Sequence, residues 1–139
     1  MLPVLSKVLE RVVDTQMRAF LDHLGFLHKH QYGFRRGRST AQAVGLLNNF
    51  GLDAIAGQKV TGMLFLDISN TSHSINHKIL LGKLEHKGLS ARSLRWFKSY
   101  LADRCQCVCI NGEMSETRTI DLGVPQGSIL GPLLFNVYT

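Results

Sequence analysis

The stretch LFLDISNTSHSINH, residues 64–77, sets the fold class of this 139-residue chain. It begins in an apolar run, which predicts a buried strand over residues 60–67. A polar turn follows, and then a helix that ends at Gly88 and buries apolar residues at helical spacing: Ile75, Ile79, Leu80 and Leu84. A strand that leads into a helix favours an α+β fold, with a small antiparallel sheet covered by helices.

Two more helices are predicted on the N-terminal side of this stretch. Apolar residues at three- and four-residue steps from Leu5 to Leu24 form one stripe of an amphipathic helix, and Gly25 suits its C-terminal cap. The next helix should begin at Ser39 or Thr40 and end near Gly57. Its buried side chains are expected to be Val44, Leu47, Phe50 and Ala54.

On the C-terminal side, Ser90 can cap a fourth helix that carries Leu94, Phe97 and Leu101. An alternating segment, residues 105–122, comes next. Within it Asn111-Gly112 is the strongest short signal for a β-hairpin. The last segment, GVPQGSILGPLLFNVYT, is a glycine-bounded turn that enters an apolar stretch.

The composition excludes several classes of protein. Apolar residues make up 45% of the chain, too many for a disordered tail, and no apolar run approaches the roughly 20 residues that span a bilayer. A formal charge of +6 favours a polyanionic partner, nucleic acid first. Three cysteines in CQCVC argue for a reducing, intracellular compartment. On a strand they would lie about 6.7 Å apart, which favours a half-buried row over a metal site.

Asp67 is the first candidate functional residue, because a strand end holds a carboxylate in a fixed position. It is either a magnesium ligand or a residue that caps its own turn. A phosphoryl-transfer site with two metals roughly 4 Å apart needs more than one carboxylate. His73 and His77 would share a helical face, a spacing that zinc proteases use, but surface histidines are far commoner.

Two further segments carry candidate binding residues. The loop YGFRRGRST, residues 32–40, is either a solvated basic loop or a phosphate clamp, and its arginines are Arg35, Arg36 and Arg38. In the turn VPQGS, residues 124–128, Gly127 permits close approach of a ligand or another backbone, and Gln126 offers a donor and an acceptor. A plain turn explains the same pattern.

The order of the segments is more specific than any one of them. LPVLSKVLERVV is followed by QYGFRRGRST, LFLDIS, INHKILLGKLEHKGL, WFKSYLADR, INGEMSE and LGVPQGSILGPLLFNVY. Over essentially all 139 residues the chain resembles the reverse transcriptase domain of non-LTR, LINE-type, jockey-like retrotransposons. The resemblance implies a partial right-hand polymerase, with fingers-side helices and the arginine loop over about residues 1–59. A palm portion would cover about residues 60–139.

The resemblance also implies an activity, an RNA-directed DNA polymerase in the nucleus or cytoplasm. Its partners would be an RNA template, a DNA primer and deoxynucleoside triphosphates, and its cofactor Mg²⁺. Asp67 matches the catalytic, metal-binding aspartate of the palm. Nucleotide- or template-binding roles are implied for Arg35, Arg36, Arg38, Ser72, Gln126 and Gly127.

The chain departs from the family pattern in two places. Members read Asp-Leu-Ser-Lys-Ala-Phe-Asp where this chain reads DISNTSH, so Ser72 stands at the aromatic position that rejects a 2′-hydroxyl. The Ala-Asp-Asp box of the family comes after residue 139, and the sequence holds no Asp-Asp pair. The chain alone is therefore expected to be inactive. The alternatives are a non-enzymatic, basic nucleic-acid-binding remnant of a mobile element and a fragment without function.

Overall fold

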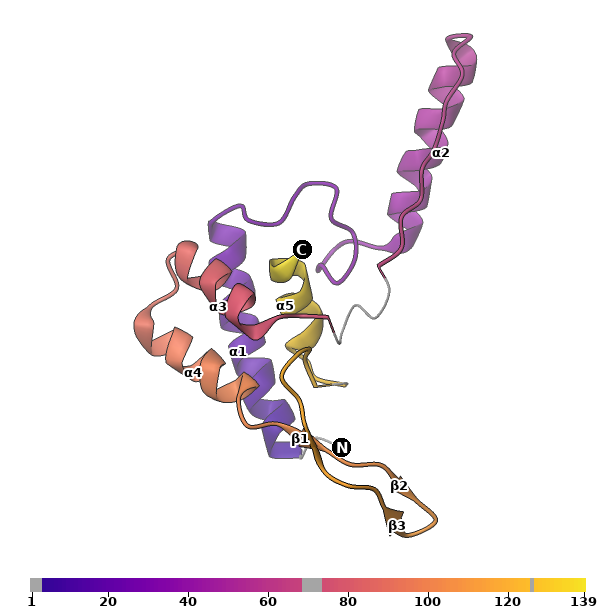
Figure 1. The fold of residues 1–139 in the computed structure, drawn as a ribbon. Coiled ribbons are helices and arrows are strands. Elements are labelled where there is room, and N and C mark those ends of the chain that lie inside the picture. Colours follow the sequence, from indigo (N-terminus) through magenta and orange to yellow (C-terminus); the bar gives the residue numbers. More distant parts are fainter. Residues whose placement is uncertain (1–3, 69–73, 126) are drawn as a thin grey trace. The chain divides into compact units, whose positions relative to one another are not determined.

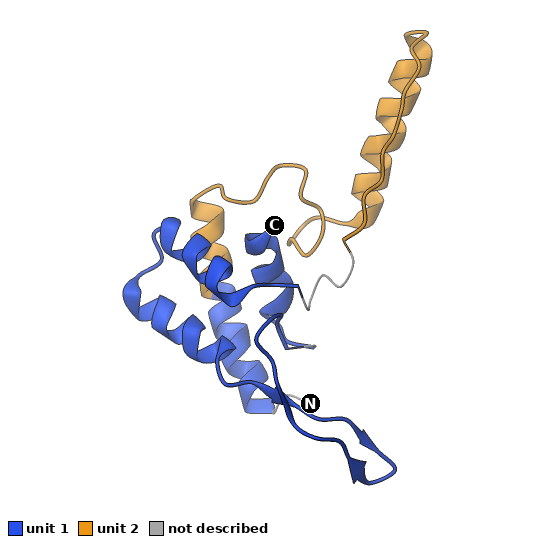
Figure 2. Ribbon diagram, in the orientation of Figure 1, with its two compact units in different colours: residues 1–15, 70–139 blue, residues 16–69 orange. Residues whose placement is uncertain are grey.

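The computed structural model describes residues 4–68, 74–125 and 127–139. In these ranges the elements follow the order α1, α2, α3, α4, β1, β2, β3, β4, α5 (Figure 1). They form two compact units: unit 1 holds residues 1–15 and 70–139, and unit 2 holds residues 16–69 (Figure 2). Helices and antiparallel strands together confirm the α+β class. No helix in the described ranges is long and apolar enough to cross a membrane.

Helix α1, Val4–His23, buries only part of its predicted apolar stripe, together with two acidic residues. Leu5 is 82% exposed, and Val8, Leu9 and Val12 are also exposed. Met17 and Leu21, which belong to the stripe, are buried as predicted, and Glu10 and Asp14 are buried in phase with them, at steps of four and three. The N-terminal half of α1 therefore turns two carboxylates inward.

The core of unit 1 is formed by α3 (His77–His86), α4 (Ala91–Leu101) and α5 (Gly131–Tyr138). Helix α3 packs against both α4 and α5. Ser90 caps α4 as predicted, because its Oγ accepts a hydrogen bond from the Ser93 N–H. Ile79 was wrongly predicted to be buried, since Leu80 and Leu84 form the inward face of α3 and Ile79 lies beside that face. The buried apolar residues of unit 1 are Ile75, Leu80, Leu84, Phe97, Tyr100, Leu101, Val124, Leu130, Leu133, Leu134 and Val137.

The strands of unit 1 form two short antiparallel pairs. β1 (Cys105–Gln106) pairs with β4 (Arg118–Thr119), and β2 (Cys109–Ile110) pairs with β3 (Glu113–Met114). The hairpin at Asn111-Gly112 is confirmed, because both residues have the positive φ, 51° and 89°, that a type I′ turn requires. All residues of these strands are exposed, so the expected cover of helices and the half-buried cysteine row were wrong.

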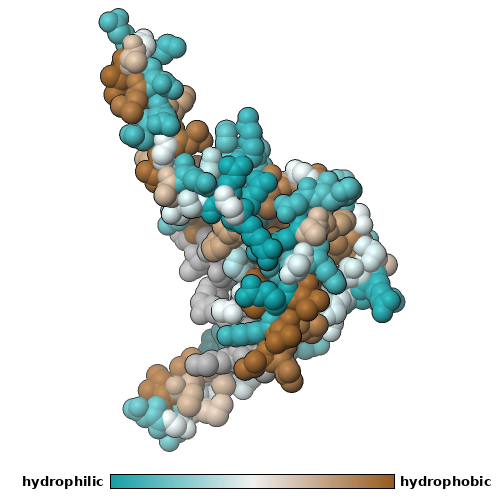
Figure 3. All heavy atoms as spheres, turned by 180° about the vertical axis from the view of Figure 1, so that it is seen from behind, coloured by the Kyte–Doolittle hydropathy of each residue, from teal (hydrophilic) through white to brown (hydrophobic). Residues whose placement is uncertain are grey.

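Unit 2 contains α2, Thr40–Ala56, whose start is confirmed by a capping box between Ser39 and Gln42. None of its residues is buried, so the four side chains predicted to be buried are not, and hydrophobic side chains lie on its surface (Figure 3). The predicted strand over residues 60–67 was also wrong. This segment is extended and runs back along α2, where Met63 Cε lies 3.9 Å from the place of a Cβ on Gly51 (Figure 1).

The reason for both errors in unit 2 is the lack of a second layer. A buried strand requires neighbouring strands for its backbone and packing on both faces. Among the residues that the structure describes, no strand pairs with residues 60–68, and Leu64 and Leu66 are 83% and 85% exposed. The apolar pattern of α2 and of residues 60–68 therefore predicts side chains that are suited to burial. In the described chain these side chains are exposed.

Candidate functional site

The turn VPQGS follows a segment that is hydrogen-bonded to the start of α3. Leu122 forms an antiparallel bridge with Asn76. The N–H of Gly123 donates to the carbonyl of Ile75 at 2.7 Å, and His77 Nε2 donates to the carbonyl of Gly123 at 2.7 Å. Three contacts thus hold the backbone on the N-terminal side of the turn, and His77 has a structural role in them.

The C-terminal side of the turn is held by a carboxylate from α1. Glu10 is only 2% exposed, and its Oε2 accepts hydrogen bonds from the N–H groups of Ile129 at 2.6 Å and Leu130 at 3.4 Å. Ser128 Oγ accepts the next one, from the Gly131 N–H at 2.9 Å. The first N–H groups of a helix have no partner within the helix. Glu10 supplies a partner for the N–H of Leu130, the N-cap of α5, and Ser128 supplies one for Gly131, its first residue.

Helix α5 carries opposite charges at its two ends. The Glu10 carboxylate lies at its N-terminus, and the Lys83 ammonium of α3 donates to the carbonyl of Tyr138 at its C-terminus. The same Lys83 nitrogen lies 5.4 Å from the centre of the Tyr138 ring. Negative charge at the start of a helix and positive charge at its end both stabilise it. The arrangement therefore favours one orientation of α5 in unit 1.

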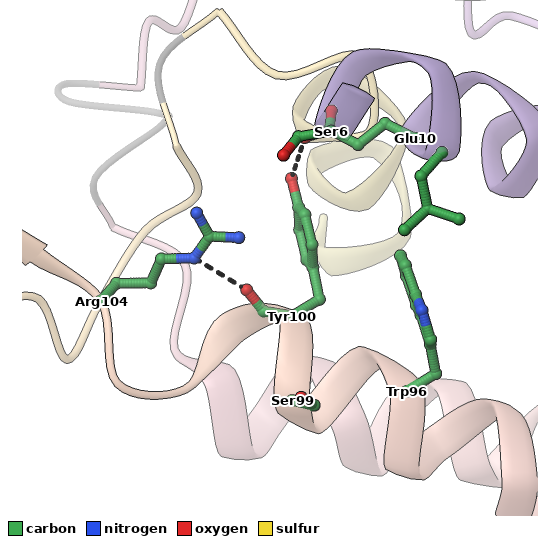
Figure 4. A pocket seen from close by; sticks show the side chains of 7 residues that line it. Ser6, Glu10, Trp96, Ser99, Tyr100 and Arg104 are labelled. Atoms are coloured by element: carbon green, nitrogen blue, oxygen red, sulfur yellow. Dashed lines mark hydrogen bonds between the residues drawn. The ribbon is translucent and has the colours of Figure 1, made fainter. Parts of the chain in front are cut away.

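Tyr100 of α4 completes the contacts of Glu10. The Tyr100 hydroxyl donates to Glu10 Oε1 at 3.2 Å (Figure 4). The Trp96 ring stacks on the Tyr100 ring, and the two ring centres lie 5.4 Å apart. Arg104 lies over the same ring, with its Cζ 4.9 Å from the ring centre. Burial raises the pKa of Tyr100 to about 12, and the charge of Glu10 adds to the rise. Tyr100 is therefore protonated at neutral pH and can donate to the carboxylate.

These side chains also line a small cavity of about 200 Å³ between α1 and α4 (Figure 4). Its remaining lining comes from Ser6, Leu9 and Ser99. Both oxygens of Glu10 already accept hydrogen bonds, and the Arg104 Nε–H donates to the Tyr100 carbonyl at 2.9 Å. The Glu10 carboxylate in the cavity is thus used to join α1 to α4 and to the start of α5.

The turn itself has the geometry that its glycine predicts. Gly127 has φ +74°, in the left-handed region that favours glycine. A Cβ built on Gly127 meets no atom within 4 Å, so this side of the turn is open. The Ser128 N–H donates to the Pro125 carbonyl at 3.1 Å and closes the turn. Gln126 lies outside the described residues.

The arginine loop belongs to unit 2, and its three arginines have different surroundings. Arg35 is half-buried, and its Nη1 donates to the carbonyls of residues 28 and 27 at 2.9 and 3.4 Å. The Arg38 guanidinium lies 5.2 Å from the centre of the Tyr32 ring. Arg36 is exposed. Arg35 therefore stabilises the loop, whereas Arg36 and Arg38 are placed at its surface, where a phosphate could reach them.

Asp67 also belongs to unit 2, near the end of the exposed segment 60–68. It is exposed and does not follow a strand, which corrects the expectation that a strand end would hold it. Within residues 4–68, 74–125 and 127–139, no three His, Cys, Asp or Glu side chains form a group that could hold a metal ion. Asp67 alone does not fit a two-metal centre. Ser72 and His73 lie outside the described residues.

Glu10 and Tyr100 were not among the residues that the sequence pattern singled out. The available signal was the spacing of Glu10 and Asp14, which are in phase with the buried Met17 and Leu21. Acidic residues are almost never fully buried unless they are paired. Two acidic residues in phase with a buried stripe therefore indicate that they have partners on another element, but only the structure identifies those partners.

Comparison with known proteins gives a match over the whole chain. Residues 1–139 match the family described as reverse transcriptase (RNA-dependent DNA polymerase). The chain is 34% identical to the probable RNA-directed DNA polymerase from transposon BS of Drosophila melanogaster, over 139 residues. It is 33% identical to the RNA-directed DNA polymerase from mobile element jockey of Drosophila funebris and 33% identical to the probable polymerase from transposon X-element of Drosophila melanogaster. All of this chain is covered, and it spans 15% of the length of each of these relatives.

Proposed function

Since this chain belongs to the reverse transcriptase (RNA-dependent DNA polymerase) family, we propose that it is the part of a retrotransposon polymerase that contacts the template, the primer and the incoming nucleotide. The match over residues 1–139 carries the proposal. In the right-hand architecture of such a polymerase, residues 1–59 would be fingers-side and residues 60–139 would belong to the palm. RNA, DNA and deoxynucleoside triphosphates would be the partners.

The proposed contacts differ in chemistry. Arg36 and Arg38 would bind phosphate oxygens, which the guanidinium fork matches, and Arg35 would hold their loop in place. Gly127, with its open face, would allow a nucleotide to approach the backbone closely, and Gln126 would hydrogen-bond to it. Ser72 would stand beside the sugar. It is too small to exclude a 2′-hydroxyl in the way that an aromatic ring does.

Mg²⁺ is the ion that we propose for the complete polymerase, with Asp67 as one ligand. A single carboxylate leaves two adjacent divalent ions with too little compensating charge. The described residues provide no group of three metal-binding side chains. The +6 charge of the chain supports a second candidate function, in which the 139 residues bind nucleic acid and do not polymerise.

One experiment tests both candidates. The chain is mixed with a fluorescent RNA template annealed to a DNA primer, and binding is followed by anisotropy. Primer extension is then assayed with deoxynucleotides and Mg²⁺ or Mn²⁺, next to the Asp67→Asn variant. We expect binding without extension in both proteins. Extension by the unmodified chain above that of Asp67→Asn would show that it is an active polymerase, and failure to bind the hybrid would contradict the proposed function.

A further inference from the structure

We propose that Glu10 is a positioning residue for the turn of residues 124–128, and that Tyr100 holds Glu10 in place. The inference rests on the proposed function, because it takes this turn as a contact for the template–primer. Glu10 would not touch the nucleic acid. It would act through the backbone amides that directly follow the turn, where Ile129 comes two residues after Gly127.

The contacts of Glu10 are unusual because they join segments that are far apart in the chain. Glu10 is separated by 119 residues from Ile129 and by 90 from Tyr100. A turn that is held on one side only can swing about that side. Here the other side is held by the contacts of Ile75 and His77 with Gly123. Both flanks of the turn are therefore attached to separate helices, α1 and α3.

The charge of Glu10 is necessary for this role. Hydrogen bonds from N–H groups to a carboxylate are about twice as strong as those between neutral groups. The Ile129 bond is short, at 2.6 Å, and it lies at a helix N-terminus, where negative charge is favourable. A buried carboxylate in unit 1 would be unfavourable without such partners. An apolar residue at position 10 could fill the space but could not hold the amides.

The first measurement is local. The Glu10→Gln variant keeps the size of the side chain and removes its charge. Hydrogen exchange should become about tenfold faster at the amides of residues 129 and 130, as expected when a charge-assisted hydrogen bond becomes neutral. Exchange in α3 should stay nearly constant. The matched control is Leu84→Ala, which removes a fully buried side chain of α3 and should not act selectively on residues 129 and 130.

The second measurement connects Glu10 with binding. The affinity for the labelled RNA–DNA hybrid is compared for the unmodified chain, Glu10→Gln, Gln126→Ala and the double variant. If Glu10 acts through the turn, we expect each single change to weaken binding several-fold, and the double change to weaken it by much less than the product of the two. Leu84→Ala, measured where it is still folded, should combine with Gln126→Ala without such coupling.

The outcomes separate the two proposals. Positioning by Glu10 is supported if Glu10→Gln selectively accelerates hydrogen exchange at the amides of residues 129 and 130 and is also coupled to Gln126→Ala in binding. If Gln126→Ala weakens binding and the double variant is weakened by the full product of the two single effects, the turn is a contact but Glu10 does not position it. If Gln126→Ala leaves the affinity unchanged, the proposed contact at the turn fails, and the positioning role fails with it.

Discussion

Replacing Tyr100 by phenylalanine should change the stability of unit 1 in opposite directions at neutral and at strongly alkaline pH. Tyr100 is 9% exposed, and its hydroxyl donates to Glu10 Oε1 at 3.2 Å. At pH 8 the Tyr100→Phe variant loses this hydrogen bond, and Glu10 Oε1 loses the donor that Tyr100 supplied. The loss should cost about 1–2 kcal/mol of the free energy of unfolding.

The alkaline effect follows from the raised pKa. Burial raises the pKa of Tyr100 from 10.0 to about 12 in the folded protein, so the folded state holds this proton more tightly than the unfolded chain. The resulting stability is fully present below pH 10 and is lost as the pH rises towards 12. A shift of this size corresponds to roughly 2–3 kcal/mol. The advantage of the unmodified chain over Tyr100→Phe should therefore shrink and then reverse sign.

Urea unfolding at a series of pH values from 8 to 12 measures this difference, and the absorbance of tyrosinate reports the titration itself. Lysine side chains also lose their protons in this range, but they do so in both proteins and cancel in the comparison. A difference in stability that stays constant from pH 8 to pH 12 would refute the argument. It would mean that the Tyr100 hydroxyl is open to water and is not held against Glu10.

Two further predictions concern the core and the basic loop. Leu134→Ala removes a fully buried side chain of α5 and should lower the free energy of unfolding by about 3–4 kcal/mol, measured with urea. Replacing both Arg36 and Arg38 with alanine should reduce the slope of log affinity against log salt by about 1.4–1.8, because two phosphate contacts are lost. Arg35 is kept because it stabilises the loop, and Arg95→Ala on α4 serves as the control. A slope that changes only with Arg95→Ala would place the contact surface on α4.

The amino-acid sequence by itself determined the helix caps and the hairpin turn of this protein, and its family. Ser39, Ser90 and Asn111-Gly112 act through neighbouring backbone groups, so their caps and turn form where the sequence predicts them. The ordered segments likewise indicated the reverse transcriptase family, which the match over residues 1–139 confirms.

Only the tertiary structure decided which faces are buried and which residues hold the turn. Burial depends on a partner surface, and the same apolar pattern is inward in α3 but exposed in α2 and in residues 60–68. The role of Glu10 depends on amides 119 residues away and on a tyrosine of another helix. Local sequence cannot encode which distant amide will lie within hydrogen-bonding distance of a carboxylate, because that distance is set by the packing of α1 with α4 and α5.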